Sequence, residues 1–369
     1  MIINQENSTV MEALRAYSSI GEVTEVTPYG NGHINRTYLG VADGKKYILQ
    51  KINSYVFKDP YGVMENIKGV TDHIRRKYEE AGLDSERCTI DIINTDAGKL
   101  LYEGSGENYW RMYVYTDNTV AIDAVRSVDD FRNSAEAFGN FQRLLSDYPA
   151  STLCEPIKDF HNTPVRYANF LKALSRNKSG RAHTVEKEIE FVKQRESFTR
   201  LLEDANQRGE LPLRVTHNDT KLNNILFDAD TGEAICIVDL DTVSPGYSVT
   251  DFGDAIRFGA NTAAEDEKDV SKVSLDLDLF RAYAEGFIRG CDGILEPSEA
   301  ALLPEGAMMM TLECGMRFLT DYLDGDVYFG VGYPTHNLVR CRTQFALFAD
   351  MERKKEQMDA IVRELLAGN

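Results

Sequence analysis

The residues most able to do chemistry in this sequence lie in one short loop, residues 217–224, which reads His-Asn-Asp-Thr-Lys-Leu-Asn-Asn. The loop brings together a carboxylate, an ammonium group and an amide, at Asp219, Lys221 and Asn224, and a second carboxylate, Asp239, follows the apolar run 235–238. Phosphoryl transfer needs such parts, because a hydroxyl must be oriented, Mg²⁺ must be held by oxygen ligands and charge on the phosphate must be neutralised. The sequence therefore predicts Asp219 as the catalytic base, Lys221 on the transferring phosphate, and Asn224 and Asp239 as magnesium ligands.

The spacing within the loop supports this interpretation. The protein-kinase loop H-R-D-L-x-x-x-N places its base and its magnesium-binding Asn at the same interval as Asp219 and Asn224. A β-hairpin fits the following segment, with strands at 224–227 and 234–239 around a turn at 228–232. This hairpin would bring Asn224 and Asp239 to one open end. If the second strand stays extended, Asp239 and Asp241 share a face; the alternative for Asp241 is a turn-forming residue before Ser244.

Composition limits the class of protein. The 369 residues are 43% hydrophobic and 10% aromatic, which is typical of a globular protein. The net charge of −18 argues against non-specific binding to nucleic acid or to anionic membranes. We find no signal-peptide pattern at residues 1–8, no membrane-length apolar run, no C-x-x-C among the six cysteines and no histidine cluster for zinc. We therefore expect a cytoplasmic protein with reduced cysteines, many of them in the core.

The order of expected elements predicts an α+β protein with two lobes. Strands are expected at 23–28, 36–41, 46–52, 89–93, 99–102 and 109–115, and a helix at 60–82. After residue 118 the pattern predicts helices at 128–146, 165–175, 184–206, 275–290, 297–324 and 334–365. A small β-rich N-lobe, residues 1–117, would bind the nucleotide, and a larger, mainly α-helical C-lobe, residues 118–369, would carry the catalytic loop and the acceptor site. This is the layout of a bilobal protein-kinase-like fold.

Three segments of the N-lobe are candidates for the nucleotide site. Gly30 and Gly32 lie in a turn that lets backbone amides approach phosphates, although such turns are common in plain hairpins. Kinases place a phosphate-binding lysine on the strand that corresponds to residues 46–52. Here Gln50 takes the usual basic position, and Lys51, the candidate for this contact, lies one residue out of phase. Residues 110–115 end the lobe where a hinge would hold adenine, which makes Met112 and Tyr115 candidate contacts; the ordinary interpretation, a buried edge strand, is compatible with this role.

A charged row marks one predicted helix of the C-lobe. Glu313, Arg317 and Asp321 recur at intervals of four residues, beside an apolar stripe. The ordinary interpretation is a solvated ladder of ion pairs that contributes little to stability. The alternative is that Arg317 faces the cleft and holds a polar substrate, with Tyr328 nearby because the chain can turn back after Gly325.

Taken together, these runs resemble the aminoglycoside phosphotransferase and choline kinase superfamily, and within it the N-acetylhexosamine 1-kinases. The resemblance covers nearly the whole chain and rests on residues 28–35, 213–226, 251–254, 257–259, 313–319 and 336–340. It implies a cytoplasmic enzyme that uses ATP and Mg²⁺ to phosphorylate the anomeric hydroxyl of N-acetylglucosamine or N-acetylgalactosamine. It also implies that the sugar is contacted by His33, Asp241, Arg317 and Tyr328.

Other functions are compatible with the same loop. A kinase of the same superfamily could act on a hydroxyl of an aminoglycoside, of choline or of homoserine. An aminoglycoside kinase would want a strongly acidic cleft, and a choline-type kinase an aromatic cage. A catalytically inactive binding module is disfavoured because Asp219, Lys221, Asn224 and Asp239 are all present.

Overall fold

The computed structural model describes residues 5–30 and 34–368, and the chain divides into two compact units. The first unit comprises the described parts of residues 1–120 together with residues 151–158 and 226–244. The second comprises residues 121–150, 159–225 and the described part of 245–369. Two later segments therefore belong to the first unit, and one of them, 226–244, carries Asp239 and Asp241.

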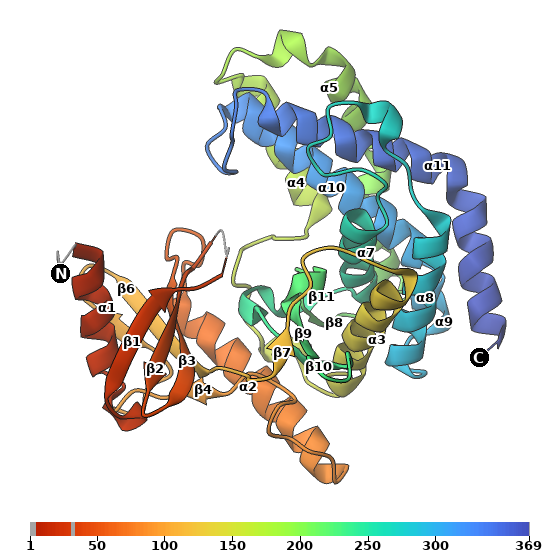
Figure 1. Ribbon diagram of the computed structural model, residues 1–369. Helices are drawn as coiled ribbons and strands as arrows, with labels where there is room; N and C mark the ends of the chain where they lie inside the picture. The colour runs from red at the N-terminus through yellow and green to blue at the C-terminus, as the bar shows by residue number, and fades with distance from the viewer. Residues whose placement is uncertain (1–4, 31–33, 369) are drawn as a thin grey trace. The chain divides into compact units, whose positions relative to one another are not determined.

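The first unit is built on an antiparallel sheet (Figure 1). Its strands follow the order β1-β2-β3-β6-β4, and β5 pairs with another part of β6. The strands are β1 Val23–Pro28, β2 Arg36–Ala42, β3 Lys45–Ile52, β4 Ile92–Ile93, β5 Tyr102–Gly104 and β6 Asn108–Val114. Strands β1, β2, β3 and β6 confirm their predictions, whereas β4 covers only the end of the strand predicted at 89–93 and β5 overlaps the strand predicted at 99–102 only at residue 102. Strand β6 has neighbours on both sides, so its interpretation as an edge strand is wrong.

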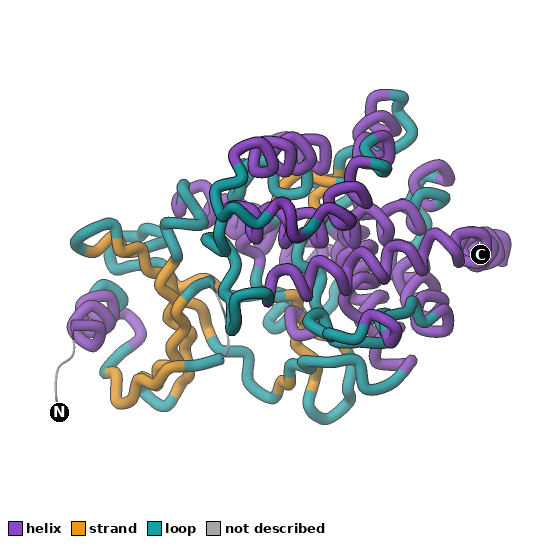
Figure 2. The backbone as a smooth tube through the Cα atoms, turned by 90° about the horizontal axis from the view of Figure 1, so that it is seen from above, coloured by secondary structure: helices purple, strands orange, loops and turns teal. Residues whose placement is uncertain are grey.

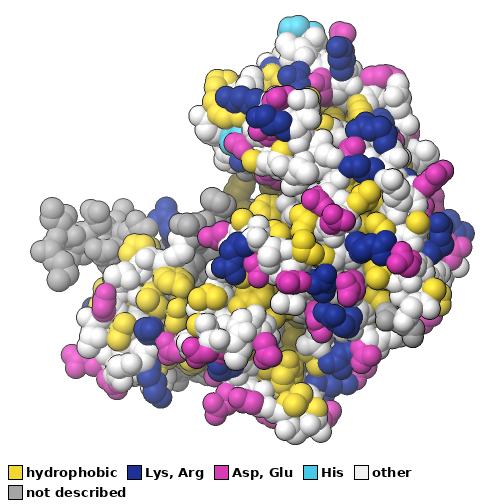
Figure 3. Space-filling view, turned by 45° about the vertical axis from the view of Figure 1, so that its right-hand side comes forward, with side chains coloured by type: hydrophobic (Ala, Val, Ile, Leu, Met, Phe, Trp, Pro, Cys, Tyr) yellow, Lys and Arg dark blue, Asp and Glu magenta, His cyan; other side chains and the backbone are white. Residues whose placement is uncertain are grey.

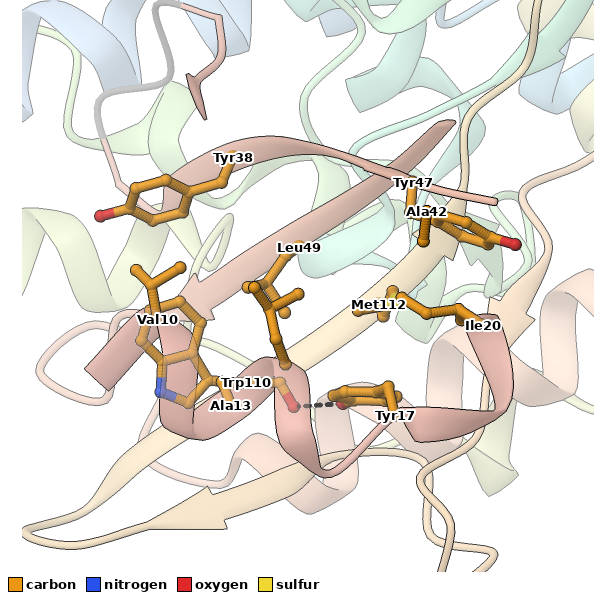
Figure 4. Close-up of a cluster of buried hydrophobic side chains, with 11 residues drawn as sticks. Val10, Ala13, Tyr17, Ile20, Tyr38, Ala42, Tyr47, Leu49, Trp110 and Met112 are labelled. Atoms are coloured by element: carbon orange, nitrogen blue, oxygen red, sulfur yellow. Dashed lines mark hydrogen bonds between the residues drawn. The ribbon is translucent and has the colours of Figure 1, made fainter. Parts of the chain in front are cut away.

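Two helices flank this sheet. Helix α1, Gln5–Arg15, places Val10 and Ala13 against Leu49 and Trp110 of the sheet (Figure 4). Just after α1, the Tyr17 hydroxyl donates a hydrogen bond of 2.9 Å to the Trp110 carbonyl. Helix α2, Pro60–Glu80, confirms the predicted helix at 60–82. It begins with proline at its first turn and with Asp59 capping an N-terminal amide, as helix starts commonly do.

The hairpin after the catalytic loop forms largely as predicted. Strand β9, Ile225–Asp228, begins directly after Asn224, and β10, Ala234–Ile237, pairs with it. Strand β7, Thr119–Val120, pairs with the other edge of β9. Strand β10 ends two residues before the predicted end at Asp239, so the condition under which Asp239 and Asp241 would share a strand face is not met. Asp239 has φ +58° and ψ +52°, a left-handed conformation that aspartate tolerates better than most residues, and a 3₁₀ turn follows it.

The second unit is mainly helical (Figures 1 and 2). A short strand, β8 Arg214–Thr216, precedes the catalytic loop and pairs with β11 Ser244–Gly246. The helices are α3 Val128–Leu144, α4 Thr163–Arg176, α5 Glu186–Lys193, α6 Leu201–Gln207, α7 Ser248–Gly259, α8 Leu277–Cys291, α9 Pro297–Ala300, α10 Leu303–Asp324 and α11 His336–Gly368.

Helix α7 was not among the predicted helices. Its polar residues Asp251, Asp254 and Arg257 recur every three residues, which is a helical signal, but the segment is only 12 residues long and residues 248–257 are all buried. Glycines allow α7 to approach α10 closely, because a Cβ atom on Gly253 would lie 2.2 Å from the Gly306 carbonyl oxygen. Two predicted helices are also interrupted. The segment 184–206 forms α5, a 3₁₀ turn and α6, and the segment 297–324 is divided before α10, whose first turn contains Pro304.

The surface and the cysteines agree with an ordinary globular protein. On the face drawn in Figure 3, basic and acidic side chains are intermingled. None of the helices in residues 5–30 and 34–368 combines the length and the apolar character needed to cross a membrane. All six cysteines are free, and Cys88, Cys236, Cys291 and Cys341 are buried.

Candidate active site

The catalytic loop brings its three predicted residues into direct contact. The Asp219 carboxylate lies 2.7 Å from the Lys221 ammonium group. The Asn224 side-chain amide donates to the Asp219 backbone oxygen at 2.8 Å and to the Asp219 carboxylate at 3.2 Å. The side chains of Asp219 and Lys221 remain 25% and 38% exposed, so both can reach a bound molecule.

The charges in this loop support each other. Burial by itself would lower the pKa of Lys221, but the paired Asp219 carboxylate raises it above its ordinary value. Lys221 is therefore a stable cation beside the predicted base. Because the Asn224 nitrogen is directed to Asp219, the Asn224 side-chain oxygen is the atom left to ligate a cation.

Helix α7 anchors the start of the loop through Asp251, a buried carboxylate to which the sequence analysis gave no individual role. Asp251 accepts hydrogen bonds of 2.8 Å from the backbone amides of His217 and Asn218 and from the Gln142 side chain. Its backbone oxygen accepts the Thr220 hydroxyl. Burial raises the pKa of Asp251, and these donors with His217 oppose that effect. The signal in the sequence was the run 251–254, which carried part of the family resemblance.

A second contact to the loop comes from His161, whose side chain is 11% exposed. His161 Nε2 lies 3.2 Å from the Asn218 carbonyl oxygen, and His161 Nδ1 lies 2.8 Å from the carboxylate of Glu313 on α10. Glu313 also accepts the Thr163 hydroxyl at 2.6 Å. No motif marked His161, because its partners are distant in sequence.

The charged row on α10 does not form the predicted ladder. Glu313 is buried against His161 and Thr163. Asp321 is 4% exposed and accepts the backbone amides of residues 327–329 and the side chain of Asn337. Within the part of the chain that is described, no carboxylate lies within 4.0 Å of the Arg317 guanidinium. The solvated-ladder interpretation is therefore wrong, because both acidic residues are used inside the protein.

Arg317 instead lies among aromatic rings. Its guanidinium carbon is 5.0 Å from the ring centre of Phe160, 5.6 Å from that of Phe329 and 6.0 Å from that of Tyr328. The Tyr328 side chain is 53% exposed, and its backbone amide is held by Asp321 just past the end of α10. The structure thus brings Arg317 and Tyr328, two predicted sugar contacts, together.

Asp241 lies in a closed polar network of the first unit. One carboxylate oxygen pairs with Arg111 and the other accepts the Asn35 side chain. Arg111 also donates from Nε and Nη2 to the Gln50 oxygen at 3.0 and 2.8 Å. The side chains of Arg111 and Asp241 are 2% and 3% exposed. Both oxygens of Asp241 are thus occupied by protein donors, and its predicted sugar contact stays a prediction.

Gln50 and Lys51 lie on opposite faces of β3. Gln50 faces Arg111, its cross-strand neighbour, whereas Lys51 shares its face with Leu49 and lies 6.0 Å from the ring centre of Trp110. The cation next to Asp241 is therefore Arg111, a residue that sequence reasoning did not select. The phosphate contact predicted for Lys51 stays a prediction.

The other nucleotide candidates are only partly described. Gly30 has φ +74°, which suits a glycine turn, while Gly32 and His33 lie outside the described residues. The Met112 side chain is buried in the core drawn in Figure 4. The Tyr115 backbone amide donates to the Lys46 carbonyl at 3.1 Å. Because Met112 also has strand partners on both sides, Leu49 of β3 and Ile93 of β4, the nucleotide contact predicted there stays a prediction.

An antiparallel sheet unit, a larger helical unit and a loop with Asp, Lys and Asn in contact define a protein with a kinase-like fold. The family model for the phosphotransferase enzyme family matches residues 25–287. Because this match covers well over half of the chain, the protein belongs to the phosphotransferase enzyme family.

Solved structures share this fold at low sequence identity. An aminoglycoside phosphotransferase from Alicyclobacillus acidocaldarius is 11% identical with a TM-score of 0.61, over 97% of this chain and 96% of that one. A microcompartment-associated aminopropanol kinase is 14% identical with a TM-score of 0.61, over 95% and 98% of the two chains. A choline kinase from Cryptosporidium parvum is 13% identical with a TM-score of 0.52, over 93% of each chain. At such identities the likeness shows the fold alone.

Proposed function

We propose that this phosphotransferase uses ATP and Mg²⁺ to phosphorylate the anomeric hydroxyl of an N-acetylhexosamine, N-acetylglucosamine or N-acetylgalactosamine. The observation that carries the proposal is the pairing of Arg317 with Tyr328 beside two further rings. A planar guanidinium can donate to two neighbouring oxygens, and an aromatic ring covers the apolar face of a sugar. The resemblance of the sequence to N-acetylhexosamine 1-kinases points to the same residues.

The charge at this position favours a neutral acceptor over a cationic one. An aromatic cage for choline needs empty rings, but here the rings already surround the Arg317 guanidinium. Arg166 adds a second cation close enough to lower the pKa of Glu313 together with Arg317. Two guanidinium groups would repel an ammonium or an aminoglycoside polycation.

The loop residues take the roles that their contacts support. Asp219 orients and deprotonates the acceptor hydroxyl, and Lys221, held beside it, neutralises charge on the transferring phosphate. The side-chain oxygens of Asn224 and Asp239 would hold Mg²⁺, which supplies charge neutralisation on the nucleotide phosphates. These are hard oxygen donors, and no cluster of three or more His, Cys, Asp or Glu side chains in the described residues offers a metal site of another kind.

The nucleotide would be held by the first unit. We assign its phosphates to the turn at Gly30 and Gly32 and to Lys51, and its base to the backbone around Met112 and Tyr115. The support is the left-handed conformation of Gly30, which glycine adopts readily and which leaves open space beside its Cα atom.

Product analysis tests the proposal. ADP release is measured with free N-acetylhexosamines, simple hexoses, choline, aminopropanol, homoserine and kanamycin, with and without a chelator. We expect N-acetylhexosamines to be the best acceptors, activity to disappear with chelator and return with Mg²⁺, and phosphorus NMR to show phosphate coupled to the anomeric proton. Phosphorylation at another hydroxyl, or of amines or amino alcohols only, would refute the sugar 1-kinase assignment. The broader assignment as a small-molecule phosphotransferase would still hold.

A further inference from the structure

The backbone amides of residues 325–329, which directly follow α10, all donate to Asp321. The first two bind the backbone oxygen of Asp321, at 2.9 and 2.8 Å. The next two bind one carboxylate oxygen, both at 2.8 Å, and the fifth binds the other carboxylate oxygen at 2.9 Å. The Asn337 side chain donates to that second oxygen at 2.8 Å. One residue of the helix thus determines the path of the chain that leaves it.

The Asp321 carboxylate is not needed to end the helix. Gly325 has φ +100°, the left-handed conformation that commonly ends a helix, and its amide bonds the helix backbone without any side chain. A carboxylate in the last turn is unfavourable by itself, because the C-terminal end of a helix carries partial negative charge. Asp321 is buried, so its protein donors and not water must offset this cost. The carboxylate therefore serves the segment beyond the helix.

That segment carries two of the aromatic rings beside Arg317. The ring centres of Tyr328 and Phe329 lie 6.0 and 5.6 Å from its guanidinium carbon. Phe329 also packs against Phe318 of α10, with 4.6 Å between the ring centres. The Tyr328 side chain is half-exposed, so packing holds it less firmly than the ring that follows it. Its position depends more on the backbone, which Asp321 binds.

Other residues secure the two ends of the segment. At its start, the Asp326 carboxylate pairs with Arg181. At its far end, the Gly330 carbonyl oxygen accepts a hydrogen bond of 3.1 Å from Arg340. The amides of the three residues between these ends are the ones that the Asp321 carboxylate binds. Removing the carboxylate should therefore release the middle of the segment while its ends stay attached.

We propose that Asp321 is a positioning residue for the acceptor, because it holds the backbone that places the Tyr328 ring beside Arg317. The inference rests on the proposed function, in which Arg317 and Tyr328 contact the acceptor. Both carboxylate oxygens of Asp321 are bound by protein donors, so Asp321 acts through Tyr328 and does not touch the acceptor itself. Although Asp321 is paired inside the protein, its partners belong to the segment that carries a ligand contact, so its loss should reach the acceptor.

A matched pair of variants tests this by kinetics, with the best acceptor found by ADP release. Asp321→Asn leaves one acceptor oxygen where the carboxylate has two. Asp350 of α11 is the control, because it is also buried and accepts the Leu275 amide at 2.8 Å. Both variants should lower the Tm, because each leaves a buried donor unpaired. Asp321→Asn should also raise the KM of the acceptor roughly tenfold, about the effect of one lost hydrogen-bonded contact, and leave the KM of ATP unchanged.

The control decides how a rise in KM is interpreted. Asp350→Asn should leave both KM values unchanged although it lowers the Tm. An unchanged acceptor KM in Asp321→Asn would overturn the proposal. An equal rise in Asp350→Asn would do the same, because the effect would then come from general destabilisation.

A double-mutant cycle with Tyr328 tests whether Asp321 acts through that ring. If it does, adding Asp321→Asn to Tyr328→Ala should raise the acceptor KM by no more than roughly twofold, because the positioned ring is already missing. Residues that act independently would instead show the full tenfold rise in both backgrounds, and that result would contradict a positioning role.

Hydrogen exchange provides a test that needs neither turnover nor a folded variant. In the wild-type protein at pH 7, mass spectrometry of peptides that span residues 325–331 should show the amides of residues 327–329 exchanging at least about 100-fold more slowly than in an unfolded chain. Rapid exchange of these amides would refute the proposal even if no variant folds. If no N-acetylhexosamine is phosphorylated, the sugar assignment fails, whereas the protection of these amides and the kinetic test with the actual acceptor remain valid.

Discussion

Arg111 in the first unit and Arg317 in the second use their guanidinium groups in opposite ways. Arg111 is buried, and its donors are taken by Asp241 and Gln50. Arg317 lies among three aromatic rings, and the described residues place no carboxylate within 4.0 Å of it. A satisfied cation can only position its partners, whereas an unsatisfied one retains donors for a ligand. Sequence alone does not distinguish the two, because both are arginines among aromatic residues.

The comparison predicts that substituting a side chain that is free to bind a ligand alters the kinetics. Substituting a side chain whose donors and acceptors are paired inside the protein should alter stability instead. Asp219 and Asp241 give the largest contrast. Asp219→Asn should lower kcat by roughly 10²–10⁴-fold with little change in Tm, because it removes a general base that is not needed to hold the fold. Asp241→Asn is the matched control and should lower Tm. Turnover and thermal unfolding of both variants check this, and near-normal kcat in Asp219→Asn would remove Asp219 from the role of base.

The closed network should respond strongly to loss of one partner. Arg111→Met leaves the Asp241 carboxylate buried without its cation, which typically costs about 3–5 kcal/mol of unfolding free energy. Replacing both residues, as Arg111→Met with Asp241→Leu, should recover much of that loss because no unpaired charge remains. Urea unfolding of the single and double variants measures the difference. Equal losses in both would show that the ion pair itself, and not the unpaired charge, determines stability.

Substitution of Arg317 should weaken binding of the acceptor. Arg317→Ala should raise the KM of the acceptor roughly 10- to 100-fold through loss of charge-assisted hydrogen bonds, and leave the KM of ATP unchanged. Arg317→Lys should restore only part of the affinity, because an ammonium cannot donate as a planar fork. The unfolding free energy should change by no more than about 0.5 kcal/mol. If Arg317→Ala binds the acceptor normally, or lowers only the unfolding free energy, Arg317 does not contact the substrate.

The smallest effect is expected at a carboxylate far from the loop. Burial raises the pKa of Asp350, but hydrogen bonds from Lys354, the Leu275 amide and Ser274 lower it to about 2. A lowered folded-state pKa stabilises the protein above the pKa of the unfolded chain, and the gain disappears as the pH falls toward 2. Asp350→Asn should therefore cost on the order of 1 kcal/mol at pH 7, after allowance for solvent screening, and almost nothing near pH 2. Unfolding measured at both pH values checks this; an equal loss at both would exclude ionisation as the cause.

Local sequence patterns predicted most of the elements that carry the site. Strands β1, β2, β3 and β6, helix α2 and most of the hairpin β9–β10 form where expected, because alternation, helical spacing, caps and turn residues are all local properties. The loop that joins Asp219, Lys221 and Asn224 is equally local, so its spacing was sufficient to predict that these side chains meet. Helix α7 was missed although Asp251, Asp254 and Arg257 recur at helical spacing in its sequence.

The sequence by itself thus determined the catalytic loop, the kind of chemistry its residues can support and the order of the main elements. Tertiary structure alone decided which charges are free. Arg111 and Asp241 lie 130 residues apart in the sequence, and His161 and Glu313 lie 152 apart. Whether such a side chain pairs inside the protein or keeps its donors for a ligand depends on which distant segments pack against it. Hydrogen bonding and burial are properties of that packing and not of residue type or spacing.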